Sequence, residues 1–207
     1  MYVANNPLIF VDPDGRDYVL HFDEENKTVT VAANYYTTEA GAKSAQANVD
    51  IWNEQSGQHT YTVDGVEYTV NFDLKFQVVD QADIAGLVAN DPGGNSWEVV
   101  PDGSLGENVL GGITGGNRIK VSETYSRDLV VGGHEIGHSL GMPHDHNNRG
   151  IMADSYDNAS MSITRGNVFF MMDYPLRGRQ LQVQNRHGNI IPLGRGTISH
   201  GTDPRRR

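Results

Sequence analysis

Apolar and polar residues alternate with a two-residue period along much of the first 80 residues, which is the pattern of half-buried β-strands. Polar residues 24–26 separate the first two alternating segments and favour a turn. The dipeptide Asp64-Gly65 separates the next two and favours a tight hairpin turn. The pattern therefore predicts two hairpins, the second of which continues into a longer strand. The predicted strands are residues 17–22, 27–33, 60–63, 67–70 and 71–79.

A three- and four-residue period, typical of amphipathic helices, appears in residues 39–54, where Ala42, Ala45, Val49 and Trp52 share one face. Thr37 or Thr38 precedes this helix and is suited to cap it. Two further helices are predicted at residues 126–140 and 164–172.

Residues 91–117 are rich in glycine, which disfavours a helix and predicts long loops around one short strand at residues 109–113. Residues 118–122 are predicted to form the next strand. The glycine-rich segment is a candidate rim of a substrate site. Strands and helices mixed along one chain predict an α+β fold.

The second predicted helix carries the most specific chemistry in the chain. His134 and His138 lie four residues apart, so a helix places both imidazoles on one face, where they can bind one zinc ion. Glu135 is angled away from that face and is placed to act as a general base on a water molecule. Gly141 can take a left-handed turn that reverses the chain and brings His144 to the ion as a third ligand. The spacing predicts a catalytic zinc site of a metallopeptidase.

Two other interpretations of these residues remain open. A solvated polar turn of helix would show the same His134-to-His138 spacing. A structural zinc site would use the same histidines and close the ion with a fourth protein ligand. The added glycine and third histidine make coincidence a poor explanation, because five positions must then match at once.

The run His134-Glu135-Ile136-Gly137-His138-Ser139-Leu140-Gly141-Met142-Pro143-His144, followed by a methionine, resembles the signature of the metzincin zinc peptidases. The resemblance implies that Met152 forms the Met-turn, an apolar floor beneath the ligands. It also implies a metzincin-like α+β fold: a twisted mixed sheet, a long N-terminal helix, an active-site helix and a smaller carboxyl part below the cleft. An edge strand above the zinc would pair with the substrate peptide and read little of its side chains.

Some neighbouring residues fit this resemblance less well. Asp145 matches a structural aspartate of the adamalysin type, but Asp154 stands where astacins and serralysins have a tyrosine. Tyr156 is two residues late, so it is either a candidate for stabilising the oxyanion or a packing tyrosine. His146 stays unassigned. A structural Ca²⁺ is a weaker candidate, because the acidic residues near glycines form no complete calcium loop. These residues are Asp102, Asp154 and Asp157.

Composition excludes several other classes. The 207 residues include no Cys, so zinc must be bound by His and no disulfide forms. No apolar run is long enough to span a bilayer, and no signal peptide is recognisable at the N-terminus. Residues 17–176 are expected to form the peptidase domain. This part of the chain is strongly acidic, which disfavours a nucleic-acid substrate. Residues 177–207 carry seven Arg and form a basic tail that either folds back on the acidic body, contacts an acidic partner or is solvated, and the solvated tail is the default expectation.

The first 16 residues show a different resemblance. The sequence Tyr2-Val3-Ala4-Asn5-Asn6-Pro7-Leu8-Ile9-Phe10-Val11-Asp12-Pro13-Asp14-Gly15 is similar to the end of the Rhs/YD-repeat core. In that group a variable effector domain follows the core, so the resemblance implies a bacterial toxin that is secreted as part of a larger Rhs protein, with a cognate immunity protein as partner. A protein or peptide is the expected substrate.

The sequence therefore predicts a zinc-dependent endopeptidase with Glu135 as general base. Two alternatives remain. One is a zinc-binding interaction module without turnover, and the other is a peptidase that processes its own Rhs parent.

Overall fold

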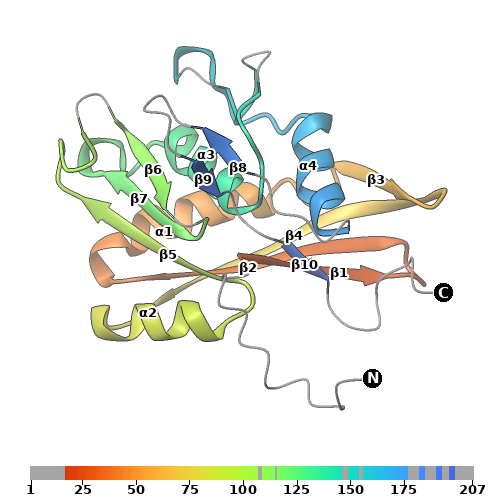
Figure 1. Ribbon diagram of the computed structural model, residues 1–207, viewed down its shortest axis with the longest axis horizontal. Coiled ribbons are helices and arrows are strands. Elements are labelled where there is room, and N and C mark those ends of the chain that lie inside the picture. Colours follow the sequence, from red (N-terminus) through yellow and green to blue (C-terminus); the bar gives the residue numbers. More distant parts are fainter. Residues whose placement is uncertain are drawn as a thin grey trace.

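The sheet is organised around the long strand β2 (Thr28–Thr37). Strand β4 (Val66–Val78) runs parallel to β2 along one of its edges. The other edge is shared, because β1 (Tyr18–Asp23) pairs antiparallel with the first half of β2 and β5 (Gly94–Val100) pairs parallel with Asn34–Tyr36. In this computed structural model the sheet therefore branches at β2, as Figure 1 shows. The structure describes residues 17–106, 109–114, 116–145, 149–153, 156–176, 182–184, 190–192 and 196–198.

The remaining strands extend the sheet at its ends. Strand β7 (Arg118–Ser122) pairs parallel with β5, and β6 (Gly111–Thr114) pairs antiparallel with β7 and ends the sheet on that side. Strand β3 (His59–Val63) forms a hairpin with β4, confirming the turn predicted at residues 64–65. Strand β10 (Gly196–Ile198) pairs parallel with β1. Strands β8 (Gln182–Gln184) and β9 (Ile190–Pro192) form a separate pair.

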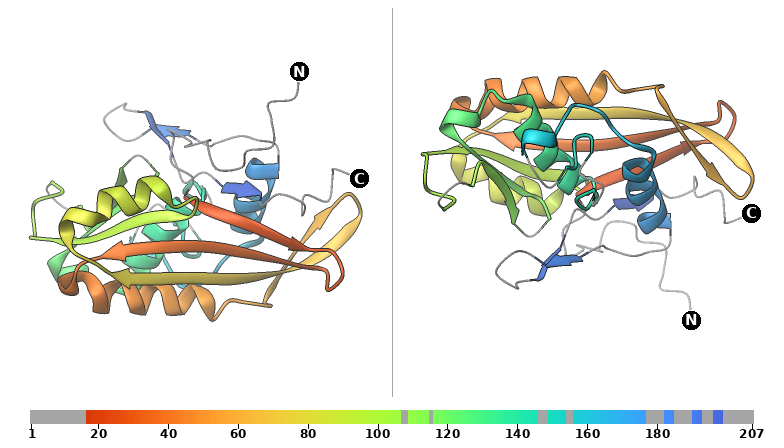
Figure 2. Two further views of the ribbon diagram at one scale, coloured as in Figure 1. Left: turned by 90° about the horizontal axis from the view of Figure 1, so that it is seen from below. Right: turned by 90° about the horizontal axis from the view of Figure 1, so that it is seen from above.

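Alternation along β2 divides its side chains between the two faces of the sheet. Tyr35 is fully buried in the main core, whereas its neighbour Tyr36 packs with Ile84 and Val88 of helix α2 (Gln81–Asn90) in a small second cluster. Helices α1 (Glu39–Asn53) and α3 (Leu129–Ser139) cover the main-core face, and α2 lies on the opposite face (Figures 1 and 2). The site helix α3 is thus held against the larger core.

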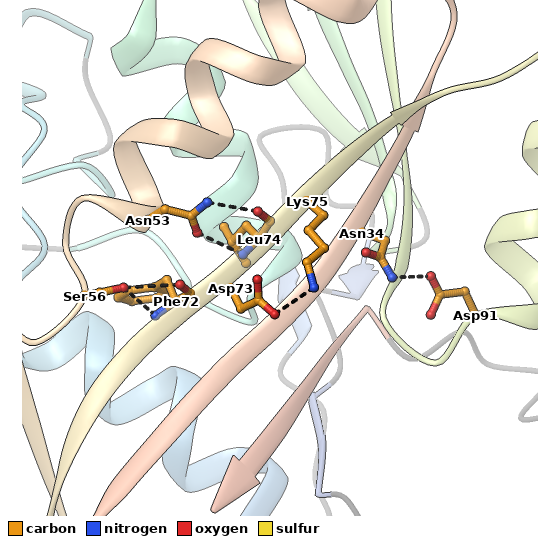
Figure 3. A network of polar contacts seen from close by, with 8 residues as sticks. All are labelled: Asn34, Asn53, Ser56, Phe72, Asp73, Leu74, Lys75 and Asp91. Atoms are coloured by element: carbon orange, nitrogen blue, oxygen red, sulfur yellow. Dashed lines mark hydrogen bonds and ion pairs between the residues drawn. The ribbon is translucent and has the colours of Figure 1, made fainter.

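Two side chains at and just after the end of α1 form hydrogen bonds with the backbone of β4, along the edge where β3 no longer pairs with it. Asn53 donates to the carbonyl of Leu74 and accepts from its N–H, both at 2.9 Å. Ser56 does the same for Phe72 (Figure 3). β4 extends past the hairpin with β3, so these side chains satisfy backbone groups that would otherwise lack partners. They also fix α1, and with it α3, against the sheet.

Helix α4 (Arg165–Leu176) is the last helix of the described residues, and it begins one residue after the start predicted at residue 164. The buried hydroxyl of Tyr18 donates to the carbonyl of Met171 at 2.7 Å, which ties α4 to β1. One short 3-10 turn, Glu123–Tyr125, precedes α3, and another, Tyr156–Asn158, follows the Met152 segment. Among the described residues, no helix is long and apolar enough to cross a membrane.

The α+β class and the hairpins are confirmed, but several predicted elements were wrong or incomplete. Helix α2 was not predicted, because only Ile84 and Val88 of its ten residues are buried and the apolar stripe is short. Strand β5 was assigned to loops, because the glycines at its start suggested turns, although Trp97 is buried in the core. Thr38 stands at the N-cap of α1 but its side chain makes no capping hydrogen bond.

The basic segment 177–207 was expected to be a solvated tail. Parts of it form strands instead, and β10 extends the main sheet beside β1. The pairing was missed because three-residue strands are too short to show an alternating pattern. Residues 1–16, which carry the Rhs-like motif, lie outside the described residues.

Candidate active site

The site helix α3 begins with a side-chain cap. Oδ1 of Asp128 accepts from the backbone N–H groups of Val130 at 2.9 Å and Val131 at 3.2 Å. Two N–H groups that have no partner within the helix are satisfied in this way. The predicted start at Ser126 was wrong, because Ser126 donates to the carbonyl of Glu123 in the preceding turn. An Asp directly before an apolar run is a known cap signal and could have located the start.

The end of α3 reverses as the sequence predicted. Gly141 has φ 80°, in the left-handed region that favours glycine. The N–H of Met142 then donates to the carbonyl of Gly137 at 3.0 Å, which closes the helix end. The reversal carries the chain back toward the helix face that bears the first two histidines, and His144 arrives beside them.

The three predicted histidines converge on one point. Nε2 of His144 lies 3.1 Å from Nε2 of His134 and 3.2 Å from Nε2 of His138. Two nitrogens bound to one tetrahedral zinc at about 2.1 Å would lie about 3.4 Å apart. Within the part of the chain that the structure describes, this is the only group of three potential ligand side chains close enough to share an ion.

The other ring nitrogen of two histidines is held by a carbonyl. Nδ1 of His134 lies 2.7 Å from the carbonyl oxygen of Ile151, and Nδ1 of His138 lies 2.8 Å from that of Met142. A carbonyl only accepts, so each Nδ1 carries the proton and each Nε2 presents a lone pair. In these neutral tautomers the Nε2 lone pairs of His134 and His138 lie close to Nε2 of His144. Such lone pairs repel one another unless a cation lies between them, so the residues fit a metal ion.

Burial keeps the central histidine neutral. His138 is buried, and this burial, followed by repulsion from His134 and His144, lowers its pKa well below the ordinary value. His134 is half-buried and His144 is exposed. One side of the triad is therefore closed by the core and the other is open to solvent, which leaves room for a water molecule or a substrate.

Glu135 directly follows the ligand candidate His134 in α3 and is 6% exposed. Burial raises its pKa to about 8, and Oε2 has no hydrogen-bond partner among the described residues. A buried carboxylate oxygen without a partner is costly. It is suited to receive the proton of a water molecule held beside the histidines, which is the role predicted for Glu135.

Met152 lies directly beneath α3. It is fully buried, and its Sδ occupies the space where a side chain at Gly137 would begin. The same segment supplies the Ile151 carbonyl to His134, and the N–H of Asp145 donates to the carbonyl of Met152 at 2.6 Å. The Met152 segment thus contacts the ligand helix and the residue next to His144.

The hydroxyl of Tyr156 donates to Oδ2 of Asp128 at 2.5 Å, and its ring contacts Tyr125 edge-on. Asp128 is the cap of α3, so Tyr156 joins the segment after Met152 to the start of the site helix. In this position the hydroxyl is engaged with a carboxylate, which raises the pKa of Tyr156.

Of the candidate calcium residues that the structure describes, Asp102 and Asp157 join no group of three potential ligands. Both carboxylate oxygens of Asp102 accept from Thr124, through its backbone N–H and its hydroxyl. Asp154 and His146 lie outside the described residues.

Two contacts that support the site were missed from the sequence. Nε1 of Trp52 donates to the carbonyl of Gly133 in α3 at 3.1 Å, and Gly111 of β6 packs against Glu135. Both partners are remote in the sequence from the motif, and no local pattern indicates either contact.

Comparison with protein families gives one match. Residues 23–184 match the family described as Metallo-peptidase family M12, the reprolysin-like peptidases. The match covers most of the chain and includes every residue of the triad, Glu135 and Met152. A comparison with curated proteins found no match.

Proposed function

The chain belongs to metallo-peptidase family M12, a family of metalloendopeptidases, and we propose that its ion is zinc, held by His134, His138 and His144. The proposal rests on the convergence of the three Nε2 atoms on one point. In His134 and His138 the Nε2 atom presents a lone pair, because a backbone carbonyl accepts from Nδ1 of the same ring. Catalytic zinc is typically bound by three protein side chains, as in a set of three histidines, and its fourth position is left for water or substrate. No fourth ligand side chain joins the cluster in the described part of the chain, which disfavours a closed structural site.

When bound, zinc supplies a Lewis acid that polarises the scissile carbonyl and lowers the pKa of a water molecule toward about 7. Glu135 accepts the proton of that water and passes it to the leaving amine. The buried position favours the first step, because the raised pKa makes the Glu135 carboxylate a stronger proton acceptor. The second step is favourable because the leaving amine is more basic than the carboxylate. His134 and His138 are kept in one tautomer and orientation by the carbonyls of Ile151 and Met142.

Strand β6 is the element best placed to bind the substrate backbone. In the described part of the chain it pairs only with β7, with Gly111 opposite Val121. The N–H of Ser122 donates to the carbonyl of Leu110, so Leu110 belongs to a hydrogen-bonded pair. Bonded pairs alternate in antiparallel strands, and the backbone groups of Gly111 and Ile113 therefore face away from β7.

An extended peptide can pair with these outward backbone groups beside Glu135. Such pairing forms hydrogen bonds with the backbone of the substrate and makes few contacts with its side chains. It therefore supports a peptidase of low sequence specificity. The open side of the triad at His144 gives the peptide access.

The proposed activity is tested by comparing wild type with E135Q. Both proteins should bind one zinc per chain by elemental analysis, because Glu135 is not a ligand. Only wild type should cleave a quenched-fluorescent peptide library, and a chelator should abolish that cleavage. Full cleavage by E135Q would contradict the role of Glu135. Zinc binding without cleavage in wild type would favour the interaction module.

We also propose that the peptidase is the effector domain of a secreted bacterial Rhs-type toxin, paired with an immunity protein. The support is the similarity of residues 2–15 to the end of an Rhs core. Expression of the chain inside bacteria tests this role: wild type should stop growth and E135Q should not. Harmless wild type that cleaves itself near residues 12–15, with no such cut in E135Q, would favour the self-processing role instead.

A further inference from the structure

The carboxylate of Glu135 is positioned by packing. Oε2 of Glu135 is buried and has no hydrogen-bond partner among the described residues. A general base has to be held within a few tenths of an ångström of its working place for efficient proton transfer. Some neighbour has to restrict this side chain by contact alone.

Gly111 of the edge strand β6 is that neighbour. A Cβ at position 111 would lie 3.0 Å from Oε1 and 3.1 Å from Cγ of Glu135, and 3.1 Å from Cγ1 of Val131. Ordinary carbon contacts are about 3.5–4.0 Å. A side chain at position 111 would therefore force its neighbours to give by a few tenths of an ångström.

Little around this contact can yield. Val131 is β-branched, buried and one turn before Glu135 on the same helix, so its side chain has few rotamers to choose from. Strand β6 is held to β7 by the Ser122-to-Leu110 hydrogen bond. An added methyl group at position 111 would have to shift the carboxylate or lift the strand.

We propose that Gly111 is a positioning residue for the peptidase reaction: its bare backbone forms the wall that fixes the Glu135 carboxylate beside the three histidines. The inference rests on the proposed role of Glu135 as general base. Any side chain at position 111 displaces the base and leaves the metal ligands in place.

Gly112 provides a matched control. It is the next residue of the same strand, it points to the opposite face, and a Cβ there would meet nothing within 4 Å. Neither glycine has a positive φ, so alanine suits the backbone at both positions. G111A and G112A therefore make the same chemical change, and only G111A touches Glu135.

The test measures kcat, KM and zinc affinity for wild type, G111A and G112A. We expect G111A to lower kcat by about tenfold, with KM and the zinc dissociation constant within about twofold of wild type, because sub-ångström misplacement of a catalytic group slows the chemical step. G112A lies on the same substrate-binding strand, so KM is free to change in it, whereas kcat and the zinc dissociation constant should stay within about twofold of wild type. In E135D, whose shorter side chain no longer reaches the wall, adding G111A should lower kcat no further.

A second readout does not use activity. With ¹³C-labelled glutamate carboxyls, the Glu135 resonance, assigned by its loss in E135Q, should move in metal-free G111A and stay unchanged in G112A. Four outcomes would overturn the proposal while wild type still shows chelator-sensitive cleavage: unchanged kcat in G111A, a rise in KM alone, an equal loss in G112A, or an unmoved resonance. Wild type without such cleavage would instead refute the proposed function itself.

Discussion

The hydroxyl of Tyr35 in strand β2 lies 2.9 Å from Oγ of Ser139, the residue that follows the second histidine of the triad. Oγ of Ser139 donates to the carbonyl of Ile136, so it must accept from Tyr35. Both residues are fully buried. A single hydrogen bond thus joins the central strand of the sheet to the ligand helix, across 104 positions of sequence.

The burial of Tyr35 predicts an alkaline limit to stability. Burial raises the pKa of Tyr35 well above its ordinary value, so Tyr35 stays protonated in the folded protein while it ionises in the unfolded chain above about pH 10. The stabilising contribution is complete below pH 10 and is lost as the pH rises further, by about 1.4 kcal/mol per pH unit.

Y35F should therefore cost about 1 kcal/mol of unfolding free energy at pH 8, because one hydrogen bond is lost. Its unfolding free energy should fall less steeply than that of wild type between pH 10 and 11.5. Urea unfolding of the metal-free proteins measures both. Parallel curves for Y35F and wild type over this range would show that Tyr35 ionises equally in both states.

A second prediction concerns the space beneath α3. G137A places a methyl group where Sδ of Met152 lies, and such overpacking typically costs about 1–3 kcal/mol. The melting temperature should fall, and zinc affinity should fall with it, because the carbonyl of Met152 accepts from the N–H of Asp145, the residue next to His144. Thermal unfolding and zinc titration measure the two effects.

The matched control for G137A is the double variant G137A/M152A. If the loss comes from this one contact, M152A should be less harmful in the G137A background than in wild type. Additive losses of stability in the two single variants would show that Gly137 and Met152 act independently.

A third prediction concerns the cap of the site helix. D128A removes an acceptor for two backbone N–H groups and should cost about 1 kcal/mol. D128N keeps the capping oxygen and should recover most of this stability. Chemical unfolding compares the two variants, and equal losses would show that the charge of Asp128, more than its cap, stabilises the fold.

A fourth prediction separates the two roles proposed for Tyr156. Its hydroxyl is bonded to Asp128, so Y156F should change kcat by less than about threefold if the residue is an anchor. Loss of a group that stabilises the oxyanion would lower kcat by about 100-fold or more. Steady-state cleavage of one peptide by wild type and Y156F distinguishes these outcomes.

The sequence predicted the triad well because its members are local. Residues 134–144 carry both the helix that aligns two ligands and the glycine turn that returns the third, and so their spacing alone encodes the geometry. The hairpins were predictable for the same reason, since alternation and turn residues are adjacent in the chain.

The supports of the site were not predictable. Gly111, Trp52 and Tyr35 lie 24, 81 and 104 residues from the residues of α3 that they contact, Glu135, Gly133 and Ser139. Nothing local marks a glycine that packs on a glutamate. Strand β5 was missed because its glycines suggest a loop, and only pairing with both β2 and β7 makes it a strand.

The two carbonyls that orient His134 and His138 belong to residues on either side of His144, at positions 151 and 142. The ligand helix can form early and locally, but its two histidines reach their working orientation only after both flanking segments have docked against it. We therefore expect tight metal binding to follow the docking of both segments. A nascent or partly unfolded chain would carry the complete motif and still bind the ion weakly, so the peptidase becomes active only once its fold is complete.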